Sequence, residues 1–243
     1  MYYALQLHEY IMITFLNKIA RKYREKNYFF KRLFDILTDN LWVDKFVVVK
    51  YDLSTLDLTR ELARMDVRWV VATQSDCERW FLGAREGFCV ERGQKMSNLI
   101  SEGGCFVIGV LGHSQDNDNF QKNSEPSDFP VCYIACGFQE KRIQNKNFRL
   151  YETEGYVYNG FTSPEYRAKG LGAGARVMVC REAKERGYSV LYADISSSNI
   201  PSLRMSEKAG AVPCGTFYHL RLLKKSYFIS FGSLKNRLKK QTS

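Results

Sequence analysis

A basic, glycine-rich turn between a strand and a helix constrains the fold of this chain more than any other segment. The turn, Ser163-Pro-Glu-Tyr-Arg-Ala-Lys-Gly-Leu-Gly-Ala-Gly-Ala175, follows a strand-like run at 154–162 and opens an apolar helical stripe. Glycine lets a backbone approach a ligand closely, and the free N–H groups at a helix start favour a phosphate. Arg167 and Lys169 add positive charge there. The segment therefore predicts a phosphate- or pyrophosphate-binding turn.

The elements around this turn predict a mixed α/β fold. A hairpin comes first and strand–helix crossovers follow, which is typical of a sheet flanked by helices. The polar stretch 113–130 is interpreted as a long loop within the hairpin. Strands are predicted at 46–51, 67–73, 105–111, 131–138, 154–162, 188–195 and within 217–229, and helices at 75–86, 90–101, 171–187 and 201–209.

Two known phosphate-binding arrangements fit the turn. In the first, Gly170-x-Gly172-x-x-Ala175 matches a dinucleotide fingerprint, and Asp194 stands 24 residues after Gly170, near the expected place of a ribose-binding acid. Against this reading, seven residues separate Thr162 from Gly170, and the chain after Asp194 lacks the further βαβ units of that fold.

The second arrangement fits better. Arg167-Ala-Lys-Gly170-Leu-Gly172 follows the pattern Arg/Gln-x-x-Gly-x-Gly/Ala, and Asn199-Ile-Pro-Ser202 with Glu207-Lys-Ala-Gly210 follows the next strand. These motifs resemble those of the GNAT superfamily of acyl-CoA-dependent N-acyltransferases. The resemblance implies an α/β fold with a mostly antiparallel mixed sheet flanked by helices. The resemblance covers the acyltransferase domain predicted at 65–232. The pattern of apolar and basic residues predicts a helical, basic amphipathic extension at 1–40, a connecting segment with one strand at 41–64 and a basic tail at 233–243.

The resemblance also implies a co-substrate, acetyl-CoA or another acyl-CoA, and a way of holding it. Backbone N–H groups of the turn would bind the pyrophosphate, the strand exit would follow the pantetheine arm, and Asn199 would lie near the thiol. The cofactor-binding residues implied in this way are Phe161, Thr162, Arg167, Ala168, Lys169, Gly170, Leu171, Gly172, Ala173 and Asn199.

In this family a primary amine attacks the thioester directly, without a covalent enzyme intermediate. Ser202 is the candidate for donating a hydrogen bond to the departing sulfur, although it could simply fill the first helical turn after Pro201. Glu154 is the candidate for receiving the amine proton through water, although a solvated carboxylate at a strand start is the plainer interpretation. The predicted acceptor is a small-molecule or peptide amine, and a homodimer is a further predicted partner arrangement.

The run 154–162 also predicts which side chains share a face. Strict alternation places Glu154, Tyr156, Tyr158 and Thr162 on one side, and Val157, Asn159 and Phe161 on the other.

Two departures from the family pattern support an alternative function. Ala211 stands where the family usually has Phe, and Ser206 stands where many members carry a tyrosine that protonates the thiolate. The alternative is a catalytically weak module that binds CoA or a partner.

Composition bears on the compartment and on charged partners. Seven scattered cysteines and three histidines predict a reducing compartment without a metal site, hence a cytoplasmic protein. Residues 1–37 have a net charge of +4 and residues 221–243 of +7, whereas 38–220 have −1. The basic ends could bind an anionic membrane surface, which would make the protein peripheral to it, or nucleic acid. We favour a solvated helix whose apolar side packs on the domain.

Overall fold

The computed structural model describes residues 41–59, 63, 65–81, 87–111, 129–138, 148–222, 225–231, 234 and 237. The extension predicted at 1–40 lies outside the described residues, as does the basic tail apart from Leu234 and Arg237. The loop predicted at 113–130 also lies outside them, except for Phe129 and Pro130, which begin a strand.

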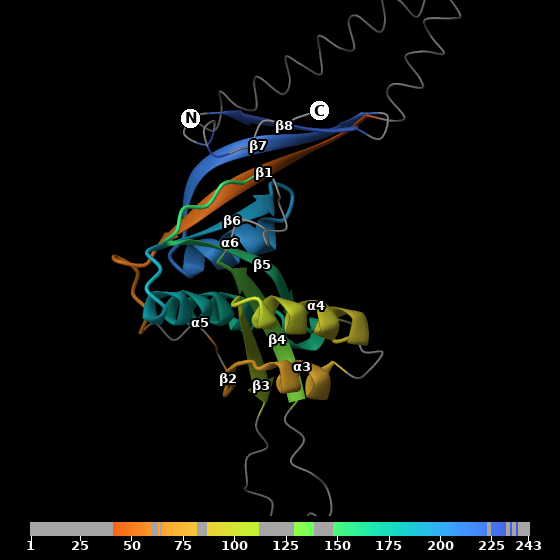
Figure 1. The fold of residues 1–243 in the computed structure, drawn as a ribbon, viewed down its shortest axis with the longest axis vertical. Helices are drawn as coiled ribbons and strands as arrows, with labels where there is room; N and C mark the ends of the chain where they lie inside the picture. Colours follow the sequence, from red (N-terminus) through yellow and green to blue (C-terminus); the bar gives the residue numbers. More distant parts are fainter. Residues whose placement is uncertain are drawn as a thin grey trace, which may run out of the picture. The chain divides into compact units, whose positions relative to one another are not determined.

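The described elements follow the predicted order along the chain (Figure 1). They are β1 (Leu41–Asp52), β2 (Arg68–Val71), α3 (Gln74–Trp80), α4 (Val90–Ser101), β3 (Cys105–Leu111), β4 (Phe129–Gly137), β5 (Glu154–Thr162), the short 3₁₀ helix η2 (Pro164–Tyr166), α5 (Leu171–Glu185), β6 (Val190–Ser196), α6 (Ile200–Lys208), β7 (Val212–Leu222) and β8 (Lys225–Phe231).

Local signals set several helix boundaries. Thr73 caps α3 through its side chain, which accepts from the Asp76 N–H, while the Asp76 carboxylate accepts from the Thr73 N–H. After α5, Gly187 adopts a φ of +85°, a conformation that glycine reaches without strain. Pro201 occupies the first turn of α6, where its missing N–H costs no hydrogen bond.

The strands form a mixed sheet in the order β2-β3-β4-β5-β6-β1-β7-β8. The pairs β2–β3, β3–β4, β4–β5 and β6–β1 are antiparallel, and β5–β6 is parallel. This confirms the predicted fold class, a mostly antiparallel mixed sheet flanked by helices.

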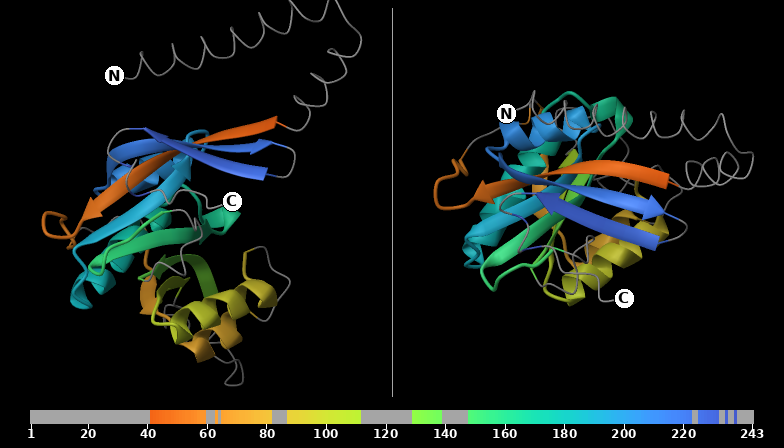
Figure 2. Two further views of the ribbon diagram at one scale, coloured as in Figure 1. Left: turned by 45° about the horizontal axis from the view of Figure 1, so that its top comes forward. Right: turned by 90° about the horizontal axis from the view of Figure 1, so that it is seen from above.

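Helices cover both faces of the sheet, as the two views in Figure 2 show. On one face, α5 buries Ala175 and Val179 in a core with Val107 and Val157. On the other face, α3 and α4 bury residues such as Phe81 and Leu99 against Phe106, Ile108 and Tyr133. The alternation of Val107 with Phe106 and Ile108 between the two cores follows from the two-residue period of a strand.

The chain divides into two compact units. One comprises Lys45–Phe217 with Ser230–Ser243, and it contains every predicted site residue. The other comprises Met1–Asp44 with Tyr218–Ile229. Within this second unit, the ring of His219 stacks on that of Phe228 with a centroid distance of 4.5 Å.

Strand β1 belongs to the sheet on which the site is built. It pairs with β6 over its Phe46–Asp52 half, so that Val48 lies opposite Asp194. The side chains of Val48 and Tyr51 are fully buried. The strand predicted within 41–64 is therefore present, and it is an interior strand of the sheet. The sequence predicts a strand here but carries no signal for which neighbour it pairs with.

Two substitutions on β1 test its place in the core. We expect Val48→Asp to lower the free energy of unfolding by about 3–5 kcal/mol, because it buries an unpaired charge. The matched control is Val43→Asp, at a position on the same strand that is 42% exposed. Urea unfolding of both variants measures the difference. Equal stability of the two variants would mean that the segment is a connector outside the core.

Candidate active site between strands β5 and β6

Strands β5 and β6 separate soon after they begin. Their parallel pairing covers only Glu154–Tyr156 against Val190–Tyr192. Beyond Tyr156 the two strands enclose a cavity of about 210 Å³. Its lining includes Asn159 and Gly160 from β5, Asp194 from β6, Asn199 and Ser202 at the start of α6, and Arg176 from α5. The cavity thus lies between two strands and reaches a helix on one face of the sheet.

A bulge in β5 shapes the cavity wall. Tyr133 of β4 pairs with Phe161, whereas Ala135, two residues on, pairs with Tyr158, so β5 has one residue more than its partner. Asn159 within this bulge has a φ of +51°. Phe161 consequently stacks on Tyr133, with a centroid distance of 5.5 Å, on the same face as Tyr158. The prediction that Phe161 shares a face with Val157 is wrong, because the extra residue reverses the alternation.

The glycine-rich turn at 163–175 has a left-handed backbone at two positions. Gly170 is the N-cap of α5 with a φ of +82°, and Ala168 has a φ of +63°. The N–H groups of Leu171 and Gly172 come before the first backbone hydrogen bonds of the helix, which the Ala173 and Gly174 N–H groups donate to the Gly170 carbonyl at 3.1 and 2.9 Å. Arg167 Nε donates to the Thr162 carbonyl at 3.2 Å, and Lys169 Nζ lies 5.0 Å from the centre of the Tyr166 ring. Two cations therefore lie beside open backbone donors.

Gly172 allows α5 to approach α6 closely. A Cβ at this position would lie 2.4 Å from Met205 Sδ and 3.6 Å from Thr162 Oγ1. The glycine thus has a packing role beside any role toward a ligand. The neighbouring residues Leu171 and Ala173, in the first turn of α5, are also buried.

Ser202 and Asn199 lie together on the cavity wall. Asn199 is the N-cap of α6, and its Oδ1 accepts from the Ser202 N–H at 3.2 Å. The Ser202 hydroxyl oxygen accepts from Arg176 Nη2 at 3.1 Å. The structure therefore brings these two predicted residues together at one site, close to the turn.

Asp194 is the cavity-lining carboxylate. The Tyr156 hydroxyl donates to Asp194 Oδ1 at the point where β5 and β6 separate. Burial raises the pKa of Asp194 above its usual range, and the hydrogen bond from Tyr156 partly opposes that rise. A carboxylate of this kind is a stronger base than an exposed aspartate.

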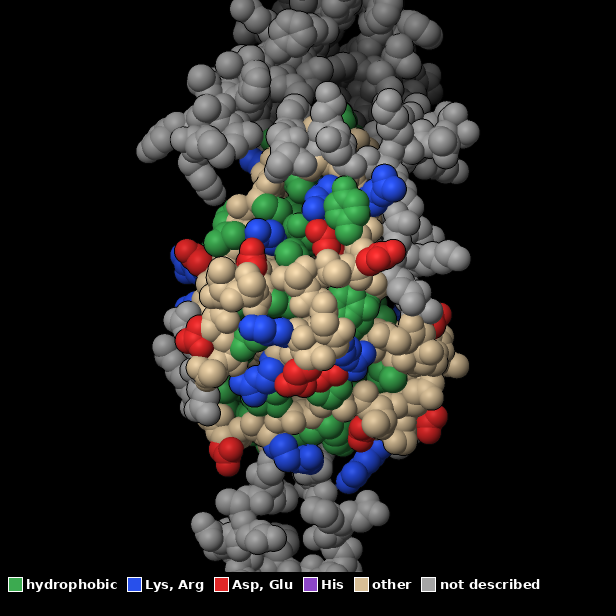
Figure 3. Space-filling view, turned by 60° about the vertical axis from the view of Figure 1, so that its left-hand side comes forward, with side chains coloured by type: hydrophobic (Ala, Val, Ile, Leu, Met, Phe, Trp, Pro, Cys, Tyr) green, Lys and Arg blue, Asp and Glu red, His purple; other side chains and the backbone are tan. Residues whose placement is uncertain are grey.

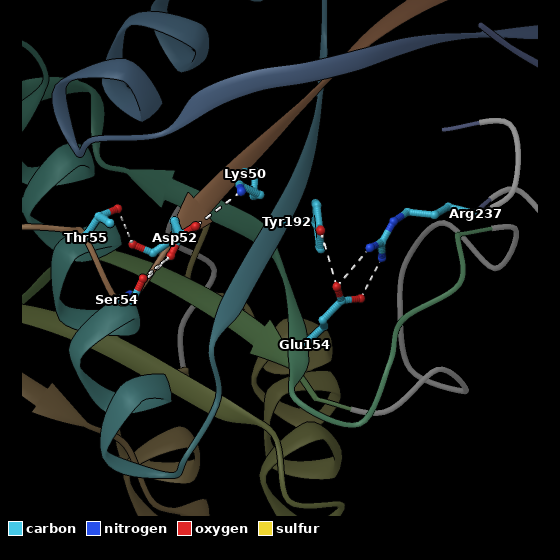
Figure 4. Close-up of polar contacts among 7 residues, drawn as sticks. All are labelled: Lys50, Asp52, Ser54, Thr55, Glu154, Tyr192 and Arg237. Atoms are coloured by element: carbon cyan, nitrogen blue, oxygen red, sulfur yellow. Dashed lines mark hydrogen bonds and ion pairs between the residues drawn. The ribbon is translucent and has the colours of Figure 1, made fainter. Parts of the chain in front are cut away.

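Glu154 lies outside the cavity lining and accepts four hydrogen bonds, of which Figure 4 shows those from Arg237 and Tyr192. Its carboxylate forms a bidentate ion pair with Arg237, with distances of 2.6 and 3.0 Å. It also accepts from the Tyr192 hydroxyl at 3.3 Å and from the Tyr151 N–H at 3.0 Å. Burial alone would raise the pKa of Glu154, but these hydrogen bonds and the charge of Arg237 outweigh burial and lower it. Such a carboxylate is a weaker proton acceptor than an exposed glutamate.

Two residues of the cavity were given no catalytic role by the sequence reasoning. The sequence assigns Asp194 only to ribose binding, under the alternative that the turn binds a dinucleotide. The sequence does carry one indication of Arg176. This residue lies four residues after Gly172 and three before Val179, so helical spacing places a charged side chain on the apolar side of the predicted helix.

The described surface carries charges of both signs. On the face drawn in Figure 3, basic and acidic side chains lie side by side over the described surface. Among the described residues, no group of three or more His, Cys, Asp or Glu side chains could hold a metal ion. Within that same part of the chain, no helix combines the length and apolar character needed to cross a bilayer.

Comparison with known families and structures identifies the class of protein. The Acetyltransferase (GNAT) family matches residues 72–211, which is more than half of the chain. The chain therefore belongs to the GNAT acetyltransferase family. No curated protein sequence matches it.

Several solved structures are similar to this chain at low sequence identity. A GCN5-related N-acetyltransferase from Sphaerobacter thermophilus is 15% identical, with a TM-score of 0.51 over 83% of this chain and 56% of that one. A Drosophila protein is 10% identical, with a TM-score of 0.49 over 76% of this chain and 52% of that one. A GCN5-related N-acetyltransferase from Kribbella flavida is 13% identical, with a TM-score of 0.46 over 76% and 61% of the two chains. This chain thus spans between 52% and 61% of the length of these three proteins.

The Glu154–Arg237 ion pair predicts a dependence of stability on pH. Glu154 has a folded-state pKa below its ordinary value of 4.5, so its contribution is fully present above that pH and is lost as pH falls through the folded pKa. We expect Glu154→Gln to lower the free energy of unfolding at neutral pH by about 1–3 kcal/mol. The difference from the unsubstituted protein should shrink below pH 4.5. Urea unfolding at several pH values measures this, and a difference independent of pH would contradict the assigned role.

Proposed function

We propose that the protein is an acyl-CoA-dependent N-acyltransferase that transfers an acyl group, acetyl in the simplest case, to a primary amine by direct attack. One observation carries the proposal. In a member of this family, a cavity with a carboxylate on one wall and a hydroxyl and guanidinium on the other lies between β5 and β6. The phosphate-binding turn at the start of α5 lies beside it, since Gly172 O accepts from Arg176.

Acyl-CoA would be held along one line of the site. The N–H groups of Ala168 to Ala173 and the charges of Arg167 and Lys169 suit the pyrophosphate. The strand exit at Phe161 and Thr162 would follow the pantetheine arm. Because Asn199 Oδ1 is used by the Ser202 N–H, its NH₂ group is the part of that side chain left to donate to a ligand.

The Asp194 side of the cavity suits the removal of a proton from the amine, and the Ser202 side suits the departure of the thiolate. A neutral amine attacks the thioester carbonyl, and the nitrogen must then lose a proton. Asp194 is the base that we propose for this proton, in place of Glu154, because it lines the cavity and its pKa is raised. Ser202 lies on the opposite part of the lining, where its hydroxyl could donate to the departing sulfur.

The acceptor is proposed only as a class, a primary amine on a small molecule or a peptide. A carboxylate with a raised pKa suits an amine acceptor, because the attacking nitrogen becomes positively charged and gives up a proton as its bond to the carbonyl carbon forms. The alternative, a module that binds CoA without transferring an acyl group, would be recognised by tight CoA binding with no release of CoA thiol over a panel of amines.

Binding of acetyl-CoA tests the role of the turn. We expect Gly172→Glu to reduce acetyl-CoA affinity by at least about a hundredfold, because the added side chain collides with Met205, displaces the start of α5 and places a negative charge beside the turn. Calorimetric titration measures the change. Gln74→Glu is the matched charge control, since it adds the same charge at an exposed position of α3 without changing the turn.

A further variant separates packing from charge in the same titration. Gly172→Ala adds only the Cβ that approaches Met205, so it should weaken binding less than the glutamate does. Unchanged affinity in Gly172→Glu would contradict the assignment of the turn. Tight binding of NADH by the unsubstituted protein would instead favour the dinucleotide reading.

The pH dependence of turnover tests the base. Asp194 must be ionised to accept a proton, so kcat/KM should fall as pH drops through its raised pKa. We expect Asp194→Asn to lower kcat by about 10²–10⁴-fold and to remove this acidic limb. Tyr156→Phe should move the limb to higher pH, because the Tyr156 hydrogen bond lowers the Asp194 pKa. An acidic limb that persists in Asp194→Asn would assign the base elsewhere.

A further inference from the structure

Arg176 is a buried cation in the wall of the cavity. Only 8% of the residue is exposed. Its guanidinium donates through Nη2 to Ser202 Oγ at 3.1 Å, through Nε to Ser206 Oγ at 3.1 Å and through Nη1 to the Gly172 carbonyl at 2.9 Å. One side chain therefore connects the start of α5, which carries the turn, to the first turns of α6.

The three acceptors of Arg176 are all uncharged oxygens. Within the described part of the chain, the ion pairs between cations and carboxylates join other residues, such as Arg237 with Glu154. Removing a guanidinium from water costs several kcal/mol unless an opposite charge compensates for the lost hydration. An arginine keeps its charge at physiological pH, so the wall around Ser202 is suited to a ligand that carries negative charge.

The Arg176 contact also restricts what the Ser202 hydroxyl can do. A guanidinium has only donors, so the hydroxyl oxygen must act as the acceptor in this contact. The hydrogen of the hydroxyl is then left for another acceptor. Ser202 lines the cavity, so that acceptor can be a ligand atom. Ser206 receives the same guanidinium but is fully buried and is not part of the lining.

We propose that Arg176 is the positioning residue of the leaving-group side, which orients the Ser202 hydroxyl toward the sulfur of acyl-CoA and holds positive charge behind it. This inference rests on the proposed function. As the amine nitrogen bonds to the carbonyl carbon, the carbon–sulfur bond breaks and its electron pair moves to sulfur. The nitrogen gives its proton to Asp194. The thiolate accepts the Ser202 hydrogen bond and is protonated by exchange with solvent, while Arg176 stays charged.

Titration of the thiol of CoA bound to the protein tests the proposal without turnover. The thiolate absorbs in the ultraviolet, and the signal of the CoA-free protein is subtracted. We expect the apparent pKa of bound CoA thiol to lie about one unit or more below that of free CoA. Arg176→Gln and Ser202→Ala should each return it toward the free value. Ser206→Ala is the matched control, because it removes another acceptor of the same guanidinium outside the cavity lining.

Kinetics supply a second readout. Arg176→Gln should lower kcat by about ten- to a hundredfold with little change in KM for acetyl-CoA, because the interaction strengthens only as charge develops on sulfur. The double variant Arg176→Gln/Ser202→Ala should cost no more than the larger single effect, since one residue acts through the other. Arg176→Lys should recover part of the loss, because it keeps the charge.

The outcomes separate the two proposals. If the unsubstituted protein does not bind CoA, the proposed function fails and this inference fails with it. If CoA binds but the thiol of bound CoA has the same pKa in the unsubstituted protein and in Ser202→Ala, the role proposed for Arg176 and Ser202 is wrong. The proposed function then still stands. If Arg176→Gln does not fold, Arg176→Lys supplies the comparison, because it keeps the charge but loses the planar donor group that orients the Ser202 hydroxyl. A CoA thiol pKa in Arg176→Lys equal to that in the unsubstituted protein would contradict the orienting role. Equal effects of Ser202→Ala and Ser206→Ala would contradict the role of Ser202 through which Arg176 acts.

Discussion

The separation of β5 from β6 is the constraint on which the site depends. The two strands are paired at Tyr156–Tyr192 and no longer paired at Asp194, so polar groups from both strands can reach one cavity. A strand that loses its partner on one side needs support on the other. Strand β1 supplies it, because it pairs with β6 over the full length Val190–Ser196. The bulge at Asn159 then turns β5 away from the paired arrangement.

Much of this arrangement could be predicted from the sequence, because short-range rules determine it. The glycine turn, the helix that follows and the Asn199–Ser202 run occur within a few residues of one another, and each has a local physical cause. The positive φ of Gly170 and the cap at Asn199 are such cases. The family match over residues 72–211 and the sheet of mixed, mostly antiparallel strands agree with the predicted fold class. The same rules gave the strand within 41–64 but not its neighbours, since pairing partners are set by the tertiary structure.

The remaining features depend on contacts between distant residues or on a single irregularity. One extra residue in β5 moves Phe161 to the other face, and strict alternation has no means of predicting it. Glu154 looked like a free carboxylate because its partner Arg237 is far away in the sequence. Arg176 gains its place in the site from Ser202 and Ser206, which lie on another helix, α6. In each case, the chemistry of the residue follows from its partners rather than from its type.

The central claim is that acyl-CoA lies between β5 and β6 with its sulfur on the Ser202 side of the cavity. A crystal structure with a CoA thioether analogue that cannot be cleaved tests it most directly. The account predicts the sulfur within hydrogen-bond distance of Ser202 Oγ, the acyl carbon between Ser202 and Asp194, and the pyrophosphate on the N–H groups between Ala168 and Ala173. A complex in which the analogue binds elsewhere, or with its sulfur on the Asp194 side, would contradict the account.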